Sequence, residues 1–485
     1  MTTTPRMLDP GVTAQHSLST TGARLRTEEI WRLAGVSVVW LTSLLVVAVW
    51  VAGGGVQGVI GAGGGVGPRG WPAPDAMTSL GRLCGLVASN LLLHQVLLMA
   101  RVPLFERAFG HDALTRAHRL TGFWSFWLML AHVVLVVVGY AGAADRGLLA
   151  ELWTMVVSFE DMVPAALGTL ALIGVVVLSL QRARRRVRYE TWHLLHLYAY
   201  AGIFLALPHQ LSTGADFVSS PLATAYWWGL WVLAAGCTVV FRLAVPLRRS
   251  LHHRLSVQSV TPDGTRGVTV LMEGRDLEAL GLQAGQFFIW NFLDGRGLAV
   301  GHPFSVSARP DPTHLAVTVR VVGDGTRRIA AVEPGTRVLI EGPYGYMTPR
   351  VRRGRHLLMI GAGAGVAPLV SLLQELPYAR GEATLITRET RAEESLLVGT
   401  IQTLVSGRGL THVALVGPRA RTGSSWLSRS MEMVEGAQYL RAHIPSSRDC
   451  DVYMCGPGPW MDAVRADLDR AGVSRERIHF ENFGI

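Results

Sequence analysis

The segment AHRLTGFWSFWLMLAH (117–132) decides the fold of the first half of the chain. It overlaps an apolar stretch, 119–141, that is long enough to cross a bilayer, since a transmembrane helix needs about 20 residues. His118 and His132 stand close to the two ends of the segment, 14 residues apart. Ionisable side chains are costly inside a membrane, so this pair points to a functional site within the span.

Five further stretches of similar length and composition predict a six-helix transmembrane bundle. We expect the six spans at 31–52, 79–101, 119–141, 163–181, 192–211 and 225–245. The chain of 485 residues is 49% hydrophobic and only 16% charged, which is typical of membrane spans joined to a soluble part. The glycine-rich segment 53–67 follows a span rather than a strand, so we read it as a flexible outer loop.

Arginines distinguish the two sides of the membrane. The net charge of +10 is also typical of nucleic-acid-binding proteins, but the arginines gather beside the apolar spans, so we expect no nucleic-acid partner. They lie in three alternate loops, namely Arg101, Arg107, Arg116 and Arg119, then the run RARRRVR (182–188), then Arg248, Arg249 and Arg254. By the positive-inside rule, both termini of this multi-pass protein face the cytoplasm, including a polar tail at 1–29.

The third and fifth spans each carry two histidines at matching depths. His118 and His132 are 14 residues apart, and His196 and His209 are 13 residues apart, which is about 20 Å along a helix in both cases. Two imidazoles that face each other across a helix bundle can hold a haem iron from both sides. We therefore predict two b-type haems, one between His118 and His196 and one between His132 and His209.

Simpler readings of these histidines stay open. Each could be an isolated helix histidine bonded to a backbone carbonyl, His193 is an alternative to His196, and His94 in the second span is read as a buried helix histidine. On an ideal helix His196 and His209 would lie about 140° apart. Pro208 removes a backbone hydrogen bond just before His209, so we expect a bend or a local rewinding there.

The second half of the chain has the composition of a soluble protein. Short alternating strands through 251–350 predict an antiparallel β-barrel domain. Strands that alternate with helices through 354–485 predict an α/β doubly wound domain. The expected fold class is thus a multidomain membrane protein, with a transmembrane domain at 30–247 before these two domains. Four scattered cysteines (Cys84, Cys237, Cys450 and Cys455) lack metal-site spacing, and we expect no disulfides.

Three turns of the second half carry candidate chemistry. Gly361, Gly363 and Gly365 lie between a predicted strand and a predicted helix, where glycines let the backbone approach a pyrophosphate, and Pro368 fits the first turn of that helix. Gly325 and Thr326 open another helix and suit an anion, here the pyrophosphate of FAD. Cys455 and Gly456 end a parallel strand, where ligands bind, and Cys455 either lines a nicotinamide pocket or is a small buried residue.

Four motifs in this order resemble the ferredoxin–NADP reductase superfamily: HPFS (302–305), GPYG (342–345), GAGAGVAP (361–368) and MCGPG (454–458). Together with the six spans and four histidines, the chain over 30–485 resembles the ferric reductase/NADPH oxidase family in its bacterial form. The resemblance implies a protein of the bacterial plasma membrane. It would move electrons from cytoplasmic NAD(P)H through FAD and two b-type haems to a small extracytoplasmic acceptor.

The resemblance also assigns roles to residues. The flavin and its neighbouring phosphate would be held by His302, Pro303, Phe304 and Ser305, with Ser305 near the flavin N5, and the FAD pyrophosphate would meet Gly325 and Thr326. Gly342 of GPYG is a further cofactor-binding candidate. The dinucleotide pyrophosphate would be bound by Gly361, Gly363, Gly365 and Pro368, and the nicotinamide would meet Cys455 and Gly456. Arg388 matches a position that often holds a 2′-phosphate, which favours NADPH, with NADH left open. Phe483, or Ile485 in its place, would cover the flavin, so Ser305, Cys455 and Phe483 are the catalytic candidates.

Three functions fit these observations. Two share the whole electron path and differ in the acceptor, which is either ferric iron or another metal chelate, or dioxygen reduced to superoxide. The third is a membrane transporter or scaffold with a nucleotide-sensing flavin reductase-like domain and no haem. The oligomeric state is open.

Overall fold

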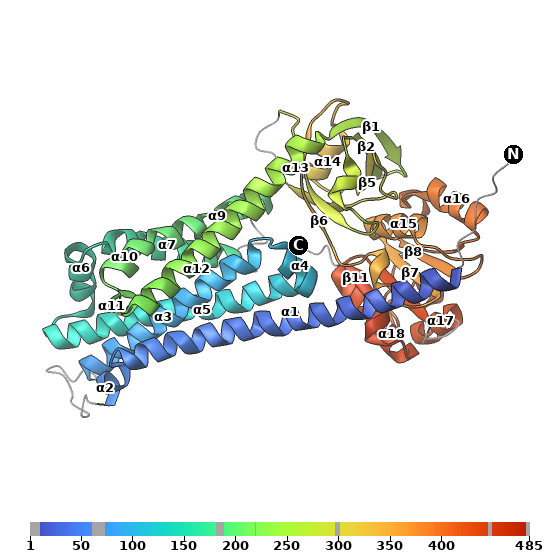
Figure 1. Ribbon diagram of the computed structural model, residues 1–485. Coiled ribbons are helices and arrows are strands. Elements are labelled where there is room, and N and C mark those ends of the chain that lie inside the picture. The colour runs from blue at the N-terminus through green and yellow to red at the C-terminus, as the bar shows by residue number, and fades with distance from the viewer. Residues whose placement is uncertain are drawn as a thin grey trace. The chain divides into compact units, whose positions relative to one another are not determined.

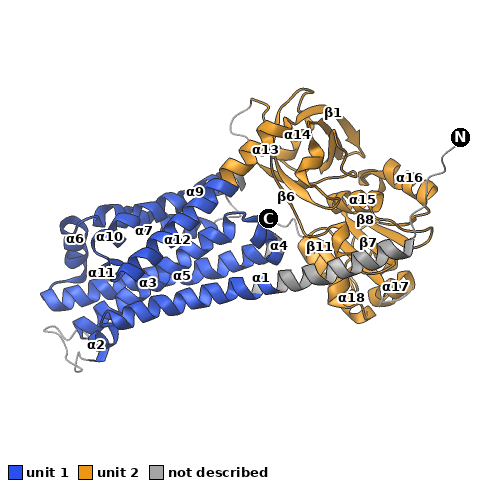
Figure 2. Ribbon diagram, in the orientation of Figure 1, with its two compact units in different colours: residues 1–241 blue, residues 242–485 orange. Residues whose placement is uncertain are grey.

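The computed structural model describes residues 10–60, 73–180, 189–218, 220–295, 301–444 and 449–481. The chain forms two compact units, residues 1–241 and 242–485 (Figure 2). The domain borders predicted near residue 350 therefore lie within the second unit, whose two sheet systems form one compact body.

The described part of the first unit is all helical (Figure 1). Its helices are α1 (Pro10–Ala52), α2 (Gly55–Ile60), α3 (Pro74–Met99), α4 (Pro103–Phe109), α5 (His111–Ala144), α6 (Leu148–Ser158), α7 (Met162–Ser179), α9 (Tyr189–Leu205), α10 (Leu207–Ser212), α11 (Ala215–Val218) and α12 (Pro221–Val239). Part of the polar segment expected as a tail is thus helical, since α1 begins at Pro10. The flexible loop expected at 53–67 is partly wrong, because α2 forms there and the Gly55 carbonyl accepts a hydrogen bond of 2.7 Å from Ser79 Oγ.

Among the described residues, five helices are long and apolar enough to cross a membrane: Leu33–Ala52, Pro74–Met99, Ala113–Ala144, Met162–Ser179 and Pro221–His253. The predicted count of six spans is not confirmed. The predicted fifth span, 192–211, is divided between α9 and α10. Its longer part, α9, has 17 residues and is about 26 Å long, somewhat less than the roughly 30 Å thickness of the hydrocarbon core.

The second unit begins with a π-helical turn (Val240–Ala244, whose last three residues belong to this unit) and α13 (Val245–His253), and continues with strands. Six strands form two antiparallel sheets of three: β1 (Ser256–Asp263), β2 (Gly267–Glu273) and β5 (His314–Arg320) in the order β1-β2-β5, and β4 (His302–Ser305), β3 (Phe287–Phe292) and β6 (Val338–Tyr344) in the order β4-β3-β6. Isolated bridges, Ser256 with Arg337 and Val306 with Val317, join the sheets. The predicted closed barrel is thus not confirmed, since these bridges do not extend into full strand pairing in the part of the chain described.

The predicted doubly wound domain has five parallel strands in the order β11-β10-β7-β8-β9. They are β7 (His356–Ala362), β8 (Ala383–Glu389), β9 (Thr411–Val416), β10 (Cys450–Cys455) and β11 (Ile478–Glu481). Alternate residues of β7 enter different cores: Leu357 and Met359 join α15 (Val366–Glu375) and α16 (Val398–Arg408), whereas Leu358 and Ile360 join α17 (Gly436–His443) and α18 (Gly458–Ala471). Because helices pack on both faces of the sheet, its central strand β7 is buried and apolar along most of its length.

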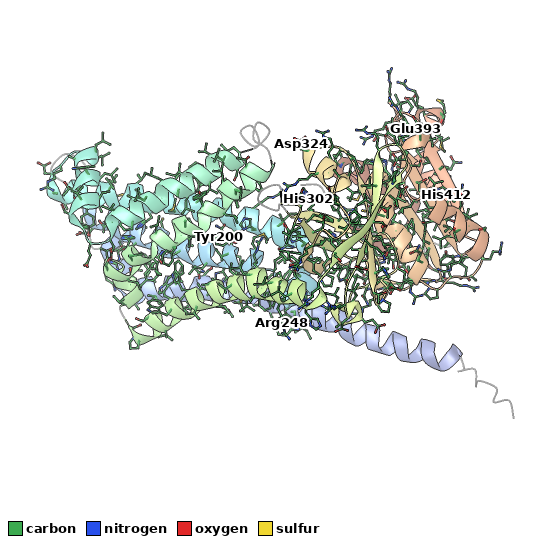
Figure 3. The ribbon with its side chains drawn as sticks, turned by 90° about the horizontal axis from the view of Figure 1, so that it is seen from above. Tyr200, Arg248, His302, Asp324, Glu393 and His412 are labelled. Carbon is green, nitrogen blue, oxygen red and sulfur yellow. The ribbon has the colours of Figure 1, made fainter. Side chains whose placement is uncertain are left out.

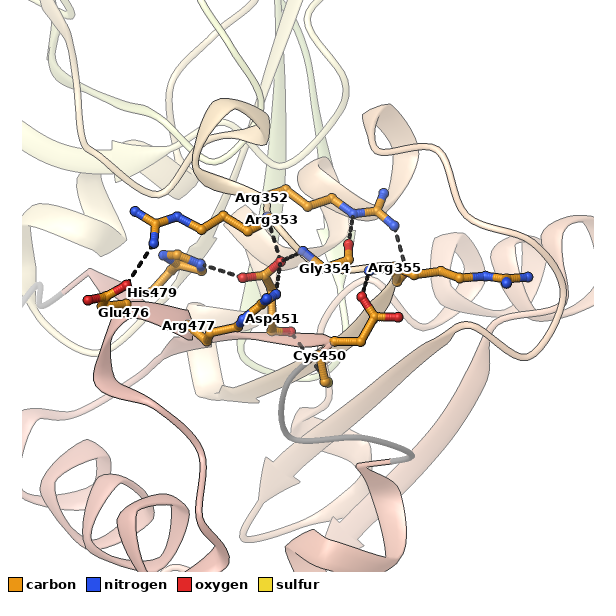
Figure 4. A network of polar contacts seen from close by, with 10 residues as sticks. Arg352, Arg353, Gly354, Arg355, Cys450, Asp451, Glu476, Arg477 and His479 are labelled. Carbon is orange, nitrogen blue, oxygen red and sulfur yellow. Dashed lines mark hydrogen bonds and ion pairs between the residues drawn. The ribbon is translucent and has the colours of Figure 1, made fainter. Parts of the chain in front are cut away.

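A buried carboxylate fixes the entry into this sheet (Figure 4). Asp451 in β10 accepts hydrogen bonds from the amides of Arg353 (2.7 Å) and Gly354, and from His479 Nε2 in β11 (3.1 Å). Burial opposes ionisation of Asp451, but the hydrogen bonds from His479 and the two amides outweigh it and lower its pKa below the ordinary value. The Asp451 carboxylate therefore ties the segment before β7 to strands β10 and β11.

Candidate functional site

The structure brings His118 of α5 next to His196 of α9. Their ring centroids are 6.2 Å apart and the ring planes cross at 69°. The Nδ1 atom of His118 lies 3.3 Å from the carbonyl oxygen of Gln95, and Nδ1 of His196 lies 3.4 Å from Ser179 Oγ. Both rings are thus held through Nδ1. This leaves Nε2, on the other side of each ring, as the nitrogen that would bind a haem iron.

A second pair has the same construction. His132 of α5 and His209 of α10 have ring centroids 6.3 Å apart, with an angle of 46° between planes. Nδ1 of His132 lies 2.9 Å from the Gly81 carbonyl oxygen, and Nδ1 of His209 lies 2.6 Å from Thr213 Oγ1. The two pairs share α5, so they are stacked along one helix.

A break between α9 and α10 brings His209 to its partner. Helix α9 ends at Leu205, and α10 begins at Leu207 with Pro208 in its first turn. The amide of Ala206 still donates to the Gly202 carbonyl (3.3 Å), but Pro208 has no amide hydrogen to continue the ladder. His196 and His209 therefore belong to two helical segments, and the angle of an ideal straight helix does not apply to them.

The spacing of both pairs fits one metal atom between two imidazoles. A metal–nitrogen bond of about 2 Å, plus roughly 1 Å from the nitrogen to the ring centre, places the centres of two opposed rings about 6 Å apart. Within the described ranges, no group of three or more His, Cys, Asp or Glu side chains could hold a metal ion. The pairs therefore fit a metal that brings its other ligands with it, as the iron of a haem does.

His94 has a different environment from the four paired histidines. It is buried in α3, where Nδ1 lies 2.7 Å from the Asn90 carbonyl oxygen and Nε2 lies 3.3 Å from Thr42 Oγ1. Both ring nitrogens thus have protein partners, as the reading of a buried helix histidine expects. The side chain of His193, the alternative to His196, lies outside the described residues.

In the second unit, the HPFS strand lies against the start of α14 (Asp324–Ala330). The ring of His302 sits so close to Gly325 that a Cβ added at Gly325 would lie 2.5 Å from it, and Figure 3 shows His302 near Asp324. His302 also stacks on Phe304 at 6.0 Å, and the Phe304 carbonyl accepts a hydrogen bond from Trp290 Nε1. The HPFS segment and the turn that contains Gly325, both predicted to bind the flavin cofactor, are thus neighbours. In sequence, Pro303 is the residue between the two stacked rings of His302 and Phe304.

Ser305 is the residue of this strand whose chemistry stands out. It is buried, and its Oγ has no hydrogen-bond partner within the described part of the chain. A buried hydroxyl without a partner costs about 1–3 kcal/mol. The residues therefore fit a bound ring with polar edge atoms, which would give this hydroxyl a partner.

Thr326 has a local role. Its Oγ1 accepts hydrogen bonds from the amides of Val322 (2.9 Å) and Gly323 (3.0 Å), and donates to the Gly323 carbonyl. The hydroxyl of Thr326, which was expected to meet a pyrophosphate, thus closes the turn before α14 by bonding the amides of Val322 and Gly323. Gly342, in β6, has its carbonyl bonded to Arg249 of α13.

The glycine-rich turn and the MCGPG segment interlock at the carboxyl end of the parallel sheet. Gly361 lies beside Cys455 in the strand register. A Cβ at Gly365 would overlap the Cys455 carbonyl group, and one at Gly456 would lie 3.1 Å from the Cβ of Ala362. Gly363 has a φ of +58°, which favours glycine, and Pro368 is buried in the first turn of α15. The sequence thus requires glycine here for backbone packing as well as for ligand access.

Cys455 is fully buried, and burial, followed by the nearby charge of Glu481, raises the pKa of its thiol. Glu481 pairs with Cys455 in the β10–β11 register, and its Oε2 lies 3.3 Å from the amide of Tyr346 and 3.4 Å from that of Met347. The end of the last strand is therefore held to the GPYG loop. Phe483 and Ile485 lie outside the described residues.

Arg388 is buried in the structure, and its guanidinium donates to backbone carbonyls. Nε and Nη2 bond to Trp426 (3.2 Å) and Gly417 (2.7 Å), while Nη1 bonds to Glu389 and Leu415. All three nitrogens thus have partners within the fold. A 2′-phosphate would have to compete with these carbonyls for the same donors.

Arg320 links the antiparallel and parallel sheets and was missed by the sequence reasoning. From the end of β5 it forms ion pairs with Glu389 and with Glu394 (3.5 Å), and it donates to the Glu394 carbonyl (2.8 Å). Burial raises the pKa of the Glu389 carboxyl, an effect that Arg320 opposes. A Cβ at Gly363 would lie 3.7 Å from the Arg320 guanidinium, so this ion-pair group borders the glycine-rich turn.

Comparison with known proteins connects both units to redox proteins. Residues 84–207 match the family described as ferric reductase like transmembrane component. This range includes three of the four paired histidines and ends two residues before His209.

The chain is similar to a ferric reductase-like membrane domain joined to a ferredoxin reductase-type module.

The relatives of the module are reductase components and flavohaemoproteins. The chain is 26% identical over 235 residues to the ferredoxin reductase component of 3-ketosteroid-9-alpha-monooxygenase from Rhodococcus rhodochrous, an alignment that covers 47% of this chain and 64% of the relative. It is 29% identical over 216 residues to a flavohemoprotein of Xylella fastidiosa, covering 42% of this chain and 51% of the relative. The chain thus spans about half to two thirds of the length of these curated relatives.

A solved structure is similar to this chain over a comparable share. It is the flavohem-like FAD/NAD binding domain of nitric oxide dioxygenase from Vibrio cholerae, with 20% identity and a TM-score of 0.39, covering 48% of this chain and all of that one.

The residues that hold the histidines of the ferric reductase-like domain were also missed by the sequence reasoning. They are Gln95, Gly81, Ser179 and Thr213, of which the first two contribute backbone carbonyls. A backbone carbonyl leaves no trace in the sequence. Of these four residues, only Thr213 could have been predicted from the sequence, because residues four apart, such as His209 and Thr213, lie on the same face of a helix.

Proposed function

We propose that this chain is a transmembrane oxidoreductase. It moves electrons from cytoplasmic NAD(P)H through FAD and two b-type haems to a small extracytoplasmic acceptor, either ferric iron or another metal chelate, or dioxygen. The proposal rests on the two histidine pairs. The ring centroids are 6.2 Å apart in His118–His196 and 6.3 Å apart in His132–His209. Helix histidines with purely structural roles have no reason to oppose each other twice at this spacing.

The cofactors, when bound, supply the redox chemistry: a flavin accepts a hydride from a nicotinamide and releases electrons singly, and haems carry single electrons. The chain supplies binding and orientation. Ser305 offers its buried hydroxyl to the flavin, and Gly365 lets the glycine-rich turn pack directly against the Cys455 carbonyl at the dinucleotide edge. In the membrane, hydrogen bonds at Nδ1 select the tautomer in which Nε2 is the ligand nitrogen.

Membrane placement follows from the arginine distribution. The loop between the second and third spans contains Arg101 and Arg116, and arginines also follow the sixth predicted span. This arrangement supports a multi-pass protein of the bacterial plasma membrane with both termini in the cytoplasm. The reductase module would then meet NAD(P)H where the cell contains it. Since the donors of Arg388 are engaged, we base no preference between NADPH and NADH on that residue.

An optical experiment on membranes tests the proposal. Adding NADPH or NADH to membranes that contain the chain should produce the absorbance of reduced b-type haem, and membranes without the chain should not show it. Oxygen consumption and ferric-chelate reduction, measured on the same membranes, then separate the two acceptors. A purified chain without b-type absorbance would overturn the proposal.

Replacing an outer ligand makes the test specific. His209→Ala should remove about half of the haem absorbance and stop acceptor reduction, while flavin reduction by NAD(P)H continues, because the flavin lies before the haems in the path. His94→Ala is the matched control, since His94 is bonded to Asn90 and Thr42 and should leave the haem content unchanged. Loss of flavin reduction in His209→Ala would contradict the proposed order.

A further inference from the structure

Helix α6 has its polar and apolar sides reversed. Glu151, its single charged residue, is buried (4% exposed) together with Met155, one turn further on. On the opposite side Leu149, Trp153 and Val157 are 84%, 69% and 53% exposed. A surface helix in water normally shows the opposite arrangement, with its apolar side covered.

The buried side of α6 packs against the helix bundle, where it contacts α5 and α7. Glu151 Oε2 lies 3.5 Å from Nη1 of Arg146, which precedes the helix. The rings of Phe159, just after the helix, and Tyr140 of α5 meet edge to face at 5.7 Å. These contacts fix the rotation of α6, so the apolar side cannot turn inward without exposing the bundle end and separating the ion pair.

The position of α6 identifies what covers its apolar side. It connects two membrane-spanning helices, α5 and α7, through three residues on each side, 145–147 and 159–161. Figure 1 shows α6 lying across the end of the helix bundle rather than along it. Helix α7, which follows α6 in the chain, also has exposed apolar side chains near its start, since Val163 and Leu167 are more than half exposed. A membrane-spanning helix such as α7 meets lipid on its exposed side, so we expect the same medium to reach the exposed side of α6.

We infer that α6 is an interfacial helix whose Leu149, Trp153 and Val157 side is immersed in the headgroup region of the bilayer. Tryptophan and tyrosine are enriched at this depth of a membrane, and apolar helix faces lie there parallel to the surface. The Ser212 hydroxyl of α10 lies 3.5 Å from the Glu160 carbonyl, directly after α6. The interfacial helix is thereby connected to the segment that carries His209, and it anchors that segment to the membrane surface.

The inference is tested with a fluorescent label on the full chain in phosphatidylcholine vesicles. The four native cysteines (Cys84, Cys237, Cys450 and Cys455) are first replaced by alanine, so that only an introduced cysteine is labelled. Trp153→Cys and Val157→Cys in this background each receive an environment-sensitive fluorophore. Lipids with a nitroxide near the headgroup should quench both labels several-fold more than iodide in the water does. Met433→Cys, in the second unit, is the control, because Met433 is 98% exposed and should be quenched by iodide alone.

Two results would overturn the inference. Quenching of both α6 labels by iodide as strongly as at position 433 would place this side in water. Quenching by neither agent would show that protein covers it, either a second copy or another subunit. Since two independent positions are labelled, one variant that fails to fold leaves the test intact, and neither reading depends on haem or flavin binding.

Discussion

At the scale of single residues, the hydrogen-bond partner of each histidine separates ligand candidates from structural histidines. The four paired rings are held through Nδ1 by two carbonyls and two hydroxyls. His94 has partners on both nitrogens, so it has no ligand atom to offer. Sequence spacing predicted which histidines would be level with each other, but the partners depend on neighbouring helices and could not be predicted from it.

Arg388 gives a prediction about stability instead of cofactor choice. Arg388→Gln should lower the free energy of unfolding by about 1–3 kcal/mol, because buried carbonyls lose their donors, and should leave the ratio of NADPH to NADH activity unchanged. Thermal unfolding and steady-state kinetics measure the two effects. Arg391→Gln, at an exposed position three residues on, is the control for stability. A selective loss of NADPH activity in Arg388→Gln would show that the arginine binds the 2′-phosphate after all.

Asp451 predicts a pH dependence with a definite sign. Its pKa in the folded chain lies below the ordinary value, which is about 3.9 in an unfolded chain. Its stabilising contribution is therefore present above about pH 4 and is lost as the pH falls through the folded-state pKa. Asp451→Asn should lower the unfolding temperature at pH 7 and differ less from the wild type near pH 3. A difference that grows towards acid pH would contradict this, and Asp469→Asn, on the exposed surface of α18, serves as control.

At the scale of elements, the predicted fifth span is divided into α9 and α10, and this division brings His209 opposite His132. Pro208 allowed a bend to be predicted from the sequence, because proline cannot continue the helical ladder. The position of the break at Ala206 depends on how α9 packs against α7, where Gly168 and Gly202 bring the helices close together. In the second unit, alternating strands were predicted correctly, whereas their division into two sheets joined by isolated bridges depends on long-range pairing that no local pattern encodes.

Pro208→Ala tests the role of the break. Restoring the backbone amide should favour a continuous helix and turn His209 away from His132, so the outer haem should be lost while the inner haem stays. Difference spectra of the reduced variant, compared with those of His209→Ala, measure this. Pro221→Ala, at the first position of α12, changes a proline that ends no helix and should keep both haems. Full retention of two haems in Pro208→Ala would mean that tertiary packing alone produces the break.

At the scale of the whole molecule, the chain is a membrane domain and a reductase module that each hold one part of the proposed electron path. The apolar spans and the order of the motifs along the sequence predicted a ferric reductase-like membrane domain followed by a ferredoxin reductase-type module, and the comparisons confirm this arrangement. Residues that join sheets, such as Arg320 and Glu481, were not predictable, because their partners are more than 60 residues away in the sequence. The two haems are proposed from the spacing of the histidine pairs, so the number of haems is the quantity to measure.

The haem content of the purified chain tests the central claim most directly. Protein concentration and haem, determined by its pyridine complex, should give two haems per chain for the wild type. One haem should remain in His118→Ala, in His132→Ala and in His209→Ala, and none in the variant that lacks both His118 and His132. A wild type with no haem, or single variants that keep both, would contradict the account.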